Sequence, residues 1–583
     1  MSISRGMRTS PPNSRWSGSL LGSGVVEGPA PSNMEHPQNT RRAVARSNTR
    51  FAFMAETPPF GQAAPRPRTA GGGCAGMPDS LCEKGLANNP PCSAPRPGAG
   101  ERAGGRAARR RGHDRREPSD PLAGKGFLHY RCVFHSGGRT MSHEPGNVFH
   151  RVLDRPLPRA VRSQGVWIET EDGRRFLDAS GGAVVVNVGH GRKEIADAVA
   201  AQLGTLSYVH PTMFTSTPLE ELARALAAHT PRGLNRFYFM SSGSEAVETA
   251  IKFARQVHLA RGNPERHLLI ARWNSYHGLT LGALAAAGRT PFRLPFYPML
   301  RDAVHLPAPY CLRCSYGLRF PSCRLRCALA IEETIRCLGP GAVSAFIGET
   351  VGGASIAVLP PPPGYWPLVR EICDRHGVLL IMDEVMCGMG RTGKWFAAEH
   401  YGATPDILVL GKGLSGGTIA LSAVAVREEH VETVRRTAGN FAHGGTFSHN
   451  VTACAAGLAA VRLLERERLV ERAADLGARL GARLREELAP HPNVGDIRGL
   501  GMMWGIEFVR ERETLSPFPR AEKLTERLWQ HLFDHGVITY KSVGMAAGDG
   551  DGLIVAPPFV ITEEEIEVVL AGLKDALQAV LGR

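Results

Sequence analysis

The 583-residue sequence has no long apolar stretch: nowhere do about 18 or more uncharged apolar residues follow one another, as a membrane-spanning helix requires. It also lacks a secretory signal, because no apolar core follows the basic residues of the first 29 positions. An organelle-targeting start is amphipathic and poor in acidic residues, whereas Glu27 and Glu35 stand here without an amphipathic pattern. We therefore expect a cytoplasmic protein with no membrane partner.

Residues 1–140 have little apolar periodicity with which to bury a core. They are rich in Pro, Gly and Arg, and they hold 21 Lys and Arg against 9 Asp and Glu. Such a basic segment could bind nucleic acid, but no aromatic or motif context accompanies it, so we expect a disordered leader without a nucleic-acid partner. The break in composition also suggests that translation begins at Met141 and that the leader is not part of the native protein.

Residues 141–583 carry 48 Lys and Arg against 46 Asp and Glu, so this part of the chain is nearly neutral. Its length is enough for a large core spread over two or three domains. We detect no internal repeat. We predict an N-terminal segment of a small lobe at 141–210, a large domain at 211–455 and a C-terminal small domain at 456–583.

Two alternating runs flank Asp172-Gly173, a pattern typical of a β-hairpin. Farther along, Thr217 fits a helix cap and Pro218 the first helical position. The helices that periodicity predicts outside the central region lie at 193–203, 219–228, within 452–488, at 521–535 and at 563–581.

Short apolar runs alternate with helical ones between about residues 235 and 424. This alternation predicts an α/β fold with a mostly parallel sheet that helices cover on both faces. Ligands of such sheets bind beyond the carboxyl ends of the strands. The expected strands are 236–240, 267–271, 343–348, 378–382 and 407–410, and the helices between them are 245–261, 329–338 and 366–376.

An acidic residue and a lysine follow two of these strands. Asp383 comes directly after residues 378–382, and Lys412 lies in a glycine-rich turn after residues 407–410. This is the pair that pyridoxal phosphate (PLP) needs: the acid keeps the ring nitrogen protonated, and the lysine forms the imine with the aldehyde and later moves a proton between the substrate Cα and C4′ of the cofactor. A loop-capping Asp and a surface Lys are the alternatives for each residue alone. Together they predict PLP as cofactor, with Lys412 and Asp383 as catalytic residues.

Other segments supply groups that would hold this cofactor. Gly243 and Ser244 lie between a strand and a helix, where free N–H groups and the serine hydroxyl would bind the phosphate. Tyr276 or His277 could stack on the ring, and Val385 would offer an apolar surface to its other face. Each signal is weak alone, since turns and core packing use the same residue types.

Residues 388–393 fit G-x-G-x-x-G and so favour a competing class, a nucleotide-binding dehydrogenase. However, several residues separate the preceding strand from Gly388, and no convincing helix opens at residue 394. The segment also fits G-x-x-x-x-G-K, but Trp395 follows where a phosphate-binding loop has Ser or Thr. Both nucleotide-binding interpretations are disfavoured, and we expect Arg391 to be structural.

Four cysteines are spaced as C-x2-C-x8-C-x3-C. Four thiolates at such spacing could hold zinc or an iron–sulfur cluster. The intervening loop is shorter than in common zinc modules, and cytoplasmic thiols are usually reduced side chains. We predict no metal and keep as the alternative site Cys311, Cys314, Cys323 and Cys327.

The chain resembles the class-III PLP-dependent aminotransferases over roughly residues 148–580, because a set of motifs occurs in the order and spacing of that family. The motifs are Ser242 to Glu248, Tyr276 to Gly278, Asp383 to Val385, Gly388 to Gly393, Pro405-Asp406, Gly411 to Gly413 and Gly445 to Phe447.

The resemblance implies a fold-type-I homodimer, in which a large PLP-binding domain is joined by a smaller α/β domain built from the N- and C-terminal segments. It implies that Thr446 reaches the phosphate bound by the neighbouring subunit, so that active sites are shared. The remaining roles that it implies are Lys412 as the imine lysine, Asp383 under the ring nitrogen, Gly243 and Ser244 on the phosphate and Tyr276 stacked on the ring.

The family pattern also suggests how substrate is held. Arg498 resembles an arginine that pairs with a substrate carboxylate, a task that suits bidentate geometry. Glu349 resembles a supporting carboxylate, although Thr350 follows it where many members have proline. Met386 stands where others often carry glutamine, so one contact near the ring hydroxyl is missing.

We therefore predict an enzyme that transfers an amino group from an amine or ω-amino acid to a 2-oxo acid such as pyruvate or 2-oxoglutarate. A decarboxylating transaminase or an aminomutase stays open, because the outcome depends on which substrate bond stands perpendicular to the ring. A non-enzymatic binding protein is opposed by the complete Asp383 and Lys412 pair. The sequence does not identify the donor or acceptor, but Arg498 favours at least one carboxylated substrate.

Overall fold

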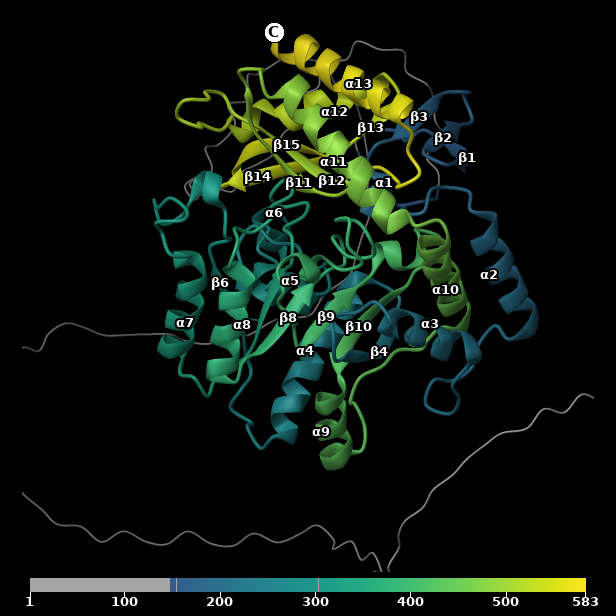
Figure 1. Ribbon diagram of the computed structural model, residues 1–583, viewed down its shortest axis with the longest axis vertical. Helices are drawn as coiled ribbons and strands as arrows, with labels where there is room; N and C mark the ends of the chain where they lie inside the picture. Colours follow the sequence, from purple (N-terminus) through teal and green to yellow (C-terminus); the bar gives the residue numbers. More distant parts are fainter. Residues whose placement is uncertain (1–146, 154, 302, 583) are drawn as a thin grey trace, which may run out of the picture. The chain divides into compact units, whose positions relative to one another are not determined.

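The computed structural model describes residues 147–153, 155–301 and 303–582, which belong to one compact unit (Figure 1). The expected disordered leader at 1–140 and the alternative start at Met141 lie outside the described residues.

The described residues form strands and helices whose bounds follow. The strands are β1 (Ala160–Gln164), β2 (Trp167–Thr170), β3 (Arg175–Asp178), β4 (Leu234–Met240), β5 (Leu268–Arg272), β6 (Val304–Leu306), β7 (Val343–Glu349), β8 (Leu379–Asp383), β9 (Ile407–Leu410), β10 (Ser422–Arg427), β11 (Val494–Leu500), β12 (Met503–Phe508), β13 (Val537–Ile538), β14 (Tyr540–Ala546) and β15 (Asp549–Val555). The α-helices are α1 (Gly181–Val184), α2 (Lys193–Thr205), α3 (Thr217–Ala227), α4 (Gly243–Ala260), α5 (Leu281–Ala286), α6 (Thr290–Arg293), α7 (Arg326–Leu338), α8 (Tyr365–His376), α9 (Glu428–Ala438), α10 (Val451–Arg466), α11 (Leu469–Leu488), α12 (Leu524–Asp534) and α13 (Glu563–Leu581). The 3-10 helices are η1 (Leu294–Met299), η2 (Cys311–Arg313), η3 (Ala397–His400), η4 (Lys412–Ser415) and η5 (Arg520–Glu522).

The central sheet has seven strands in the order β4-β10-β9-β8-β7-β5-β6. The strands from β9 through β6 run parallel to their neighbours, and only β10 pairs antiparallel, with β9 and β4. The predicted mostly parallel sheet is confirmed. Its parallel carboxyl ends meet along one edge, which is where ligands of such sheets bind.

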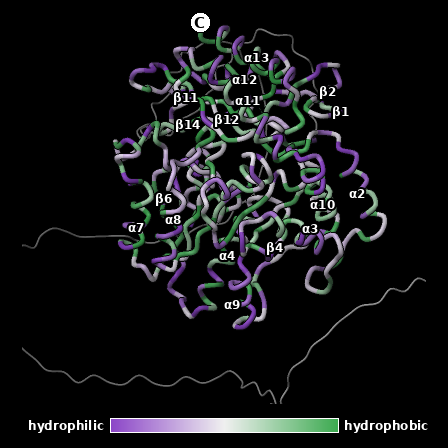
Figure 2. Tube along the Cα trace, in the orientation of Figure 1, coloured by the Kyte–Doolittle hydropathy of each residue, from purple (hydrophilic) through white to green (hydrophobic). Residues whose placement is uncertain are grey.

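Both faces of the central sheet are covered, because successive strand residues pack into different cores. In β8, Leu380 and Met382 belong to one core, and Leu379 and Ile381 belong to the other. The first core also contains residues of α7, α8 and α10, and the second contains residues of α4, α5 and α9. Figure 2 shows hydrophobic residues gathered along the sheet and its covering helices, with hydrophilic ones at the periphery.

Two smaller sheets complete the fold. The predicted hairpin forms from β2 and β3, and Gly173 between them adopts a left-handed φ of 82°. Strand β13, from the C-terminal part of the chain, pairs parallel with β3. The N- and C-terminal segments therefore share one sheet, β1-β2-β3-β13, as the predicted small α/β domain requires. The other sheet, β11-β12-β15-β14, is antiparallel, and the predicted lobe boundaries at 210 and 455 stay predictions.

Several local predictions were incomplete. The expectation that Thr217 caps the helix at 217–227 was wrong, because Ser216 is the N-cap residue and Thr217 is already helical. Strands β6 and β10 were not expected: β6 has three residues, and the small alanines of Ser422–Arg427 gave only a weak apolar signal. Within the ranges that the structure describes, no helix is both long and apolar enough to cross a membrane.

Candidate active site

Strands β8 and β9 bring the two predicted catalytic residues to the same edge of the sheet. They are parallel neighbours, and Asp383, the last residue of β8, pairs in register with Val409 of β9. Lys412 opens η4 just after β9, with a φ of 45°. That left-handed backbone costs a non-glycine residue about 1–2 kcal/mol. Backbone strain of this kind concentrates at functional sites.

Asp383 is an enclosed carboxylate with two partners, and only 4% of its surface is exposed. Its Oδ1 accepts a hydrogen bond from the N–H of Val385 at 2.9 Å, and its Oδ2 lies 2.7 Å from Nδ1 of His277. Nε2 of His277 is enclosed without a partner among the described residues. The contact places His277 against the carboxylate, which supports a positioning role rather than stacking on a ring.

Lys412 is the amine of the site. Burial lowers its pKa from 10.5 to about 8, although the charges of Asp383 and Glu349 act in the opposite direction. With this pKa about a tenth of the side chains are neutral at pH 7, compared with fewer than one in a thousand for an ordinary lysine. Its Nζ makes no hydrogen bond or ion pair with any residue in the described ranges, so the amine is free to react.

The start of α4 offers unpaired N–H groups. Ser242 and Glu245 form a capping box: Ser242 Oγ accepts from the N–H of Glu245 at 3.3 Å, and Glu245 Oε2 accepts from the N–H of Ser242 at 2.9 Å. The N–H groups of Gly243 and Ser244 have no acceptor in the part of the chain that the structure describes. Free N–H groups at a helix N-terminus bind anions, phosphate included.

Three glycines keep space beside this helix end. A Cβ added at Gly243 would come within 2.9 Å of Val385 Cγ1, and one at Gly411 within 3.3 Å of the same atom. A Cβ at Gly278 would come within 2.4 Å of Ser244 Oγ. Val385 therefore lies between the α4 N-terminus and the turn that carries Lys412. PLP needs N–H donors for its phosphate, a reactive amine and a buried carboxylate. These residues supply all three, so they fit the predicted cofactor.

Glu349 ties Tyr276 to the same edge. It ends β7 opposite Asp383, its Oε2 accepts from the N–H of Tyr276 at 3.1 Å, and its Oε1 accepts from the N–H of Gly353 at 3.0 Å. Burial raises the pKa of Glu349. Thr350 donates its N–H to the carbonyl of Asp383 at 3.2 Å, a bond that a proline in this position could not make.

Arg498 already has partners in the structure. Its Nη1 donates to Asp496 and Glu507, each at 2.8 Å, and the remaining bonds go to the carbonyls of Val358 at 2.7 Å and Ile356 at 2.6 Å. These bonds use four of its five N–H groups. Binding a substrate carboxylate would require Arg498 to exchange partners, and that role stays a prediction.

Thr446 lies apart from these residues in sequence and is exposed, in the segment between α9 and α10. Beside it, Phe447 is 58% exposed and meets Tyr208 edge to face with ring centroids 6.3 Å apart. This placement suits a residue that acts across an interface, and its contact with a partner's phosphate stays a prediction.

The four cysteines of the predicted alternative metal site carry free thiols and line one small pocket. They do not form a group of three ligand atoms within 4.8 Å of one another; among the described residues that geometry occurs at His531, His535 and Asp575. Metal binding by the cysteines stays a hypothesis.

Residues 388–393 form turns that lead to the four-residue η3, and no α-helix begins directly after residue 393. The nucleotide-binding interpretation therefore has no support. The expected structural role of Arg391 agrees with its surroundings, because its fully buried guanidinium donates to the carbonyls of Met502, Ala556 and Pro557 and to Oδ1 of Asn187.

Sequence reasoning missed two residues near Tyr276. The charges of Tyr540 and Arg289 are among those that act on the Tyr276 hydroxyl, whose pKa burial raises. Tyr540 opens β14, and Arg289 follows α5, so neither belongs to a recognisable motif. Only the fold brings them beside the aromatic ring.

Comparison with known proteins decides the family. The family model described as aminotransferase class-III matches residues 151–577. The chain belongs to the class-III aminotransferases. It is a PLP-dependent transaminase.

Individual relatives of this aminotransferase agree. It is 35% identical to the putrescine–pyruvate aminotransferase of Pseudomonas aeruginosa over 73% of its own length and 92% of the relative's. A thermostable (S)-enantioselective omega-transaminase from Thermomicrobium roseum superposes with a TM-score of 0.69 and 38% identity, covering 73% of this chain and 93% of that one. A PLP-bound amine transaminase from an uncultivated Pseudomonas species superposes with a TM-score of 0.70 and 32% identity, covering 75% of this chain and 99% of that one. The predicted fold type and cofactor are confirmed.

Proposed function

We propose that this aminotransferase moves an amino group from an amine or ω-amino acid to a 2-oxo acid, pyruvate or 2-oxoglutarate, and that Lys412 and Asp383 are its catalytic residues. The observation that carries the proposal is the pairing of a half-buried amine of pKa about 8 with a buried carboxylate at the ends of adjacent parallel strands.

Each residue has a distinct task in this proposal. When bound, PLP supplies an aldehyde and an electron-accepting ring. Asp383, held by His277 and the N–H of Val385, keeps a negative charge next to the ring nitrogen. Lys412 Nζ removes the proton from the substrate Cα, which its lowered pKa permits near neutral pH.

The remaining groups hold and orient. The N–H groups of Gly243 and Ser244 bind the phosphate, and Val385 provides the apolar surface beside it. Tyr276 would cover the ring, and the bond from its N–H to Glu349 holds its backbone at this edge of the sheet. These groups exclude water and position the substrate, and they transfer no proton.

We propose that the enzyme works as a homodimer in which Thr446 reaches the phosphate in the neighbouring subunit. Large exposed side chains near this residue support an interface: Phe447 is 58% exposed, and Tyr208, which its ring meets, is 42% exposed. Burial of such exposed apolar side chains in an interface drives association. The cytoplasmic location predicted from the sequence stays a prediction.

The substrate assignment rests on the relatives' names together with the site. A relative that uses putrescine and pyruvate supports a simple amine or diamine as donor and pyruvate as acceptor. A relative that uses diaminobutyrate and 2-oxoglutarate supports 2-oxoglutarate as the other acceptor.

A donor and acceptor panel tests the proposal. Purified holoenzyme is mixed with single donors (diamines, ω-amino acids and simple amines) and the cofactor's absorbance is followed, and each 2-oxo acid is then added to restore the starting spectrum. Several donors should change the spectrum reversibly. No conversion of any amine would refute the function, and release of carbon dioxide from a dialkylated amino acid would favour the decarboxylating alternative.

A further inference from the structure

Arg289 is an arginine without a partner. The other buried arginines near the site have acceptors: Arg293 donates to three carbonyls, and Arg272 donates to the carbonyl of Glu349 at 2.5 Å. Arg289 donates to no acceptor and forms no ion pair within the described ranges, and its Nε is fully enclosed. A partly buried charge left unpaired is costly, which indicates that its partner is a group that binds.

The guanidinium of Arg289 lies near Tyr276, and a chain of contacts connects it to Asp383. Its Cζ is 4.7 Å from the ring centroid of Phe292, and that ring meets Tyr276 edge to face at 6.1 Å. Tyr276 is in turn bonded to Glu349, which pairs in register with Asp383. The groups whose charges act on Arg289 are Tyr540, Tyr276, Arg151 and Glu349.

A second positive charge faces the same ring. Arg151, which is exposed, places its Cζ 5.1 Å from the centroid of Phe292, and it forms no ion pair with any described residue. Two guanidinium groups thus flank one aromatic ring with no acidic side chain paired to either. This arrangement attracts an anion.

We propose that Arg289 binds a carboxylate of the substrate and thereby selects carboxylated donors and acceptors over amines that have no carboxylate. This inference rests on the proposed function and names the substrate class of the same site. Arg289 can offer two parallel N–H donors to the two oxygens of a carboxylate, a match that lysine lacks. The residue determines specificity and takes no part in proton transfer.

Matched substrates test the role. 4-Aminobutyrate and butylamine have the same carbon chain but differ in the carboxylate, and 2-oxoglutarate and pyruvate differ in the distal one. In Arg289→Gln, the ratio of kcat/KM for 4-aminobutyrate to kcat/KM for butylamine should fall about 30-fold, because a charge-assisted hydrogen bond is lost. The acceptor pair distinguishes which carboxylate is bound: a fall for 2-oxoglutarate relative to pyruvate assigns the distal one, and an equal fall assigns the one they share.

Two variants and one binding measurement separate the effect of Arg289 on carboxylate binding from a general loss of activity. Arg289→Lys keeps the charge and should lose less of the ratio than Arg289→Gln. Glutarate is a diacid that cannot react. Calorimetry should give a higher Kd for glutarate with the Arg289→Gln holoenzyme than with the unaltered holoenzyme, at equal cofactor content. An unchanged ratio in Arg289→Gln, or an equal loss in Arg151→Gln, would overturn the proposal. If the unaltered enzyme converts no donor, the proposed function fails instead.

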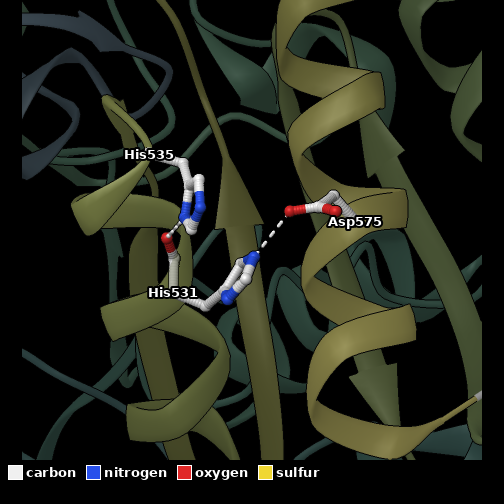
Figure 3. A group of neighbouring side chains, drawn as sticks. All are labelled: His531, His535 and Asp575. Carbon is white, nitrogen blue, oxygen red and sulfur yellow. Dashed lines mark hydrogen bonds and ion pairs between the residues drawn. The ribbon is translucent and has the colours of Figure 1, made fainter.

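A separate observation concerns the outer face of the C-terminal helices. His531 lies in the last turn of α12, His535 directly follows that helix, and Asp575 projects from α13 toward both rings (Figure 3). One ligand atom of each lies within 4.8 Å of the others. All three side chains reach solvent, so an ion has access to them.

Hydrogen bonds orient both imidazoles. Nδ1 of His535 lies 2.7 Å from the carbonyl of His531, so it donates there and leaves the lone pair on Nε2. Nε2 of His531 lies 2.6 Å from Oδ2 of Asp575. The two rings stack with centroids 4.2 Å apart. A bonded Nδ1 that fixes the tautomer is the usual support of a metal-binding histidine.

We infer that His531, His535 and Asp575 bind a zinc ion that links α12 to α13. Two imidazole nitrogens and one carboxylate oxygen are zinc ligands, and water completes the coordination at an exposed site. Binding replaces the proton that now bridges His531 and Asp575.

Zinc titration of the PLP-loaded full chain tests this site by calorimetry and thermal melting. One zinc per chain should bind and raise Tm, and His535→Ala and Asp575→Asn should each lose that zinc. Cys311→Ser with Cys323→Ser should keep it, as should His150→Ala, an exposed histidine elsewhere. The inference is overturned if His535→Ala binds as much zinc as the unaltered protein, or if the cysteine variant loses it.

Discussion

Nδ1 of His277 lies 2.7 Å from Oδ2 of Asp383, and both side chains are almost fully enclosed. The imidazole contacts Oδ2 of the carboxylate, and the N–H of Val385 donates to Oδ1 at 2.9 Å. The two contacts fix the orientation of the carboxylate. Two donors therefore orient Asp383, and Lys412 is close enough for the two charges to act on each other.

Asp383→Asn should lower kcat by about 1000-fold, because a neutral amide cannot stabilise charge at the ring nitrogen. His277→Phe keeps the carboxylate but removes its donor, and should lower kcat by about tenfold. Steady-state rates with one donor and pyruvate measure both. An Asp383→Asn enzyme with more than a tenth of normal turnover would contradict this role.

Lys412→Ala should remove turnover and the absorbance of covalently attached cofactor together. In the unaltered apoprotein, attachment requires the neutral amine. Because burial lowers the pKa of Lys412 to about 8, the attachment rate should rise about tenfold per pH unit below that value and level off above it. Stopped-flow mixing of apoprotein with PLP measures the rate. A midpoint near 10 would show that the amine is not desolvated.

Arg498→Gln should destabilise the fold by about 3 kcal/mol, since it removes a charge that faces the fully buried Glu507. The double variant with Glu507→Gln should recover only a small part of that loss, because Arg313, whose Nε donates to Glu507 at 2.8 Å, then loses its charged partner. Chemical denaturation monitors both. If Arg498→Gln instead leaves stability unchanged and raises KM only for carboxylated substrates, Arg498 is the carboxylate-binding residue that the family resemblance implies.

Mixed dimers should reveal shared sites. Lys412→Ala protein is inactive, and Thr446→Ala protein should be impaired because each phosphate loses a hydroxyl from across the interface. After the two are denatured, mixed and refolded, the hybrid holds one site with both Lys412 and Thr446, so activity should exceed the sum of the parents. Activity that only equals this sum would place Thr446 within its own subunit's site.

The central sheet and the catalytic pair were predictable, because their signals are local. Apolar runs with flanking helices predict parallel strands, and an acid and a lysine at the ends of two runs predict chemistry at one edge. The antiparallel β10 was not predictable, because its alanine-rich residues carry little periodicity. Contacts between residues that only the fold brings together were also not predictable from the sequence.

Arg289 and Arg498 illustrate that limit. The sequence around Arg289 contains no motif, and its isolation from acids appears only once Phe292 and Tyr276 are in place. Arg498 stands in a recognisable segment, yet its bonds to Glu507 and to carbonyls more than 100 positions away depend on tertiary packing. Sequence patterns identify a residue type well, but they do not reveal which of its hydrogen-bonding groups are already engaged.

Arg391 joins stretches that are distant along the chain, from Asn187 to Pro557. An engineer who exchanges lobes between transaminases must therefore transplant this guanidinium together with its acceptors. Separate expression of the N-terminal arm would remove Asn187 and leave Nη2 of the buried Arg391 without this acceptor, so the remaining fragment should be less stable until the arm is added back.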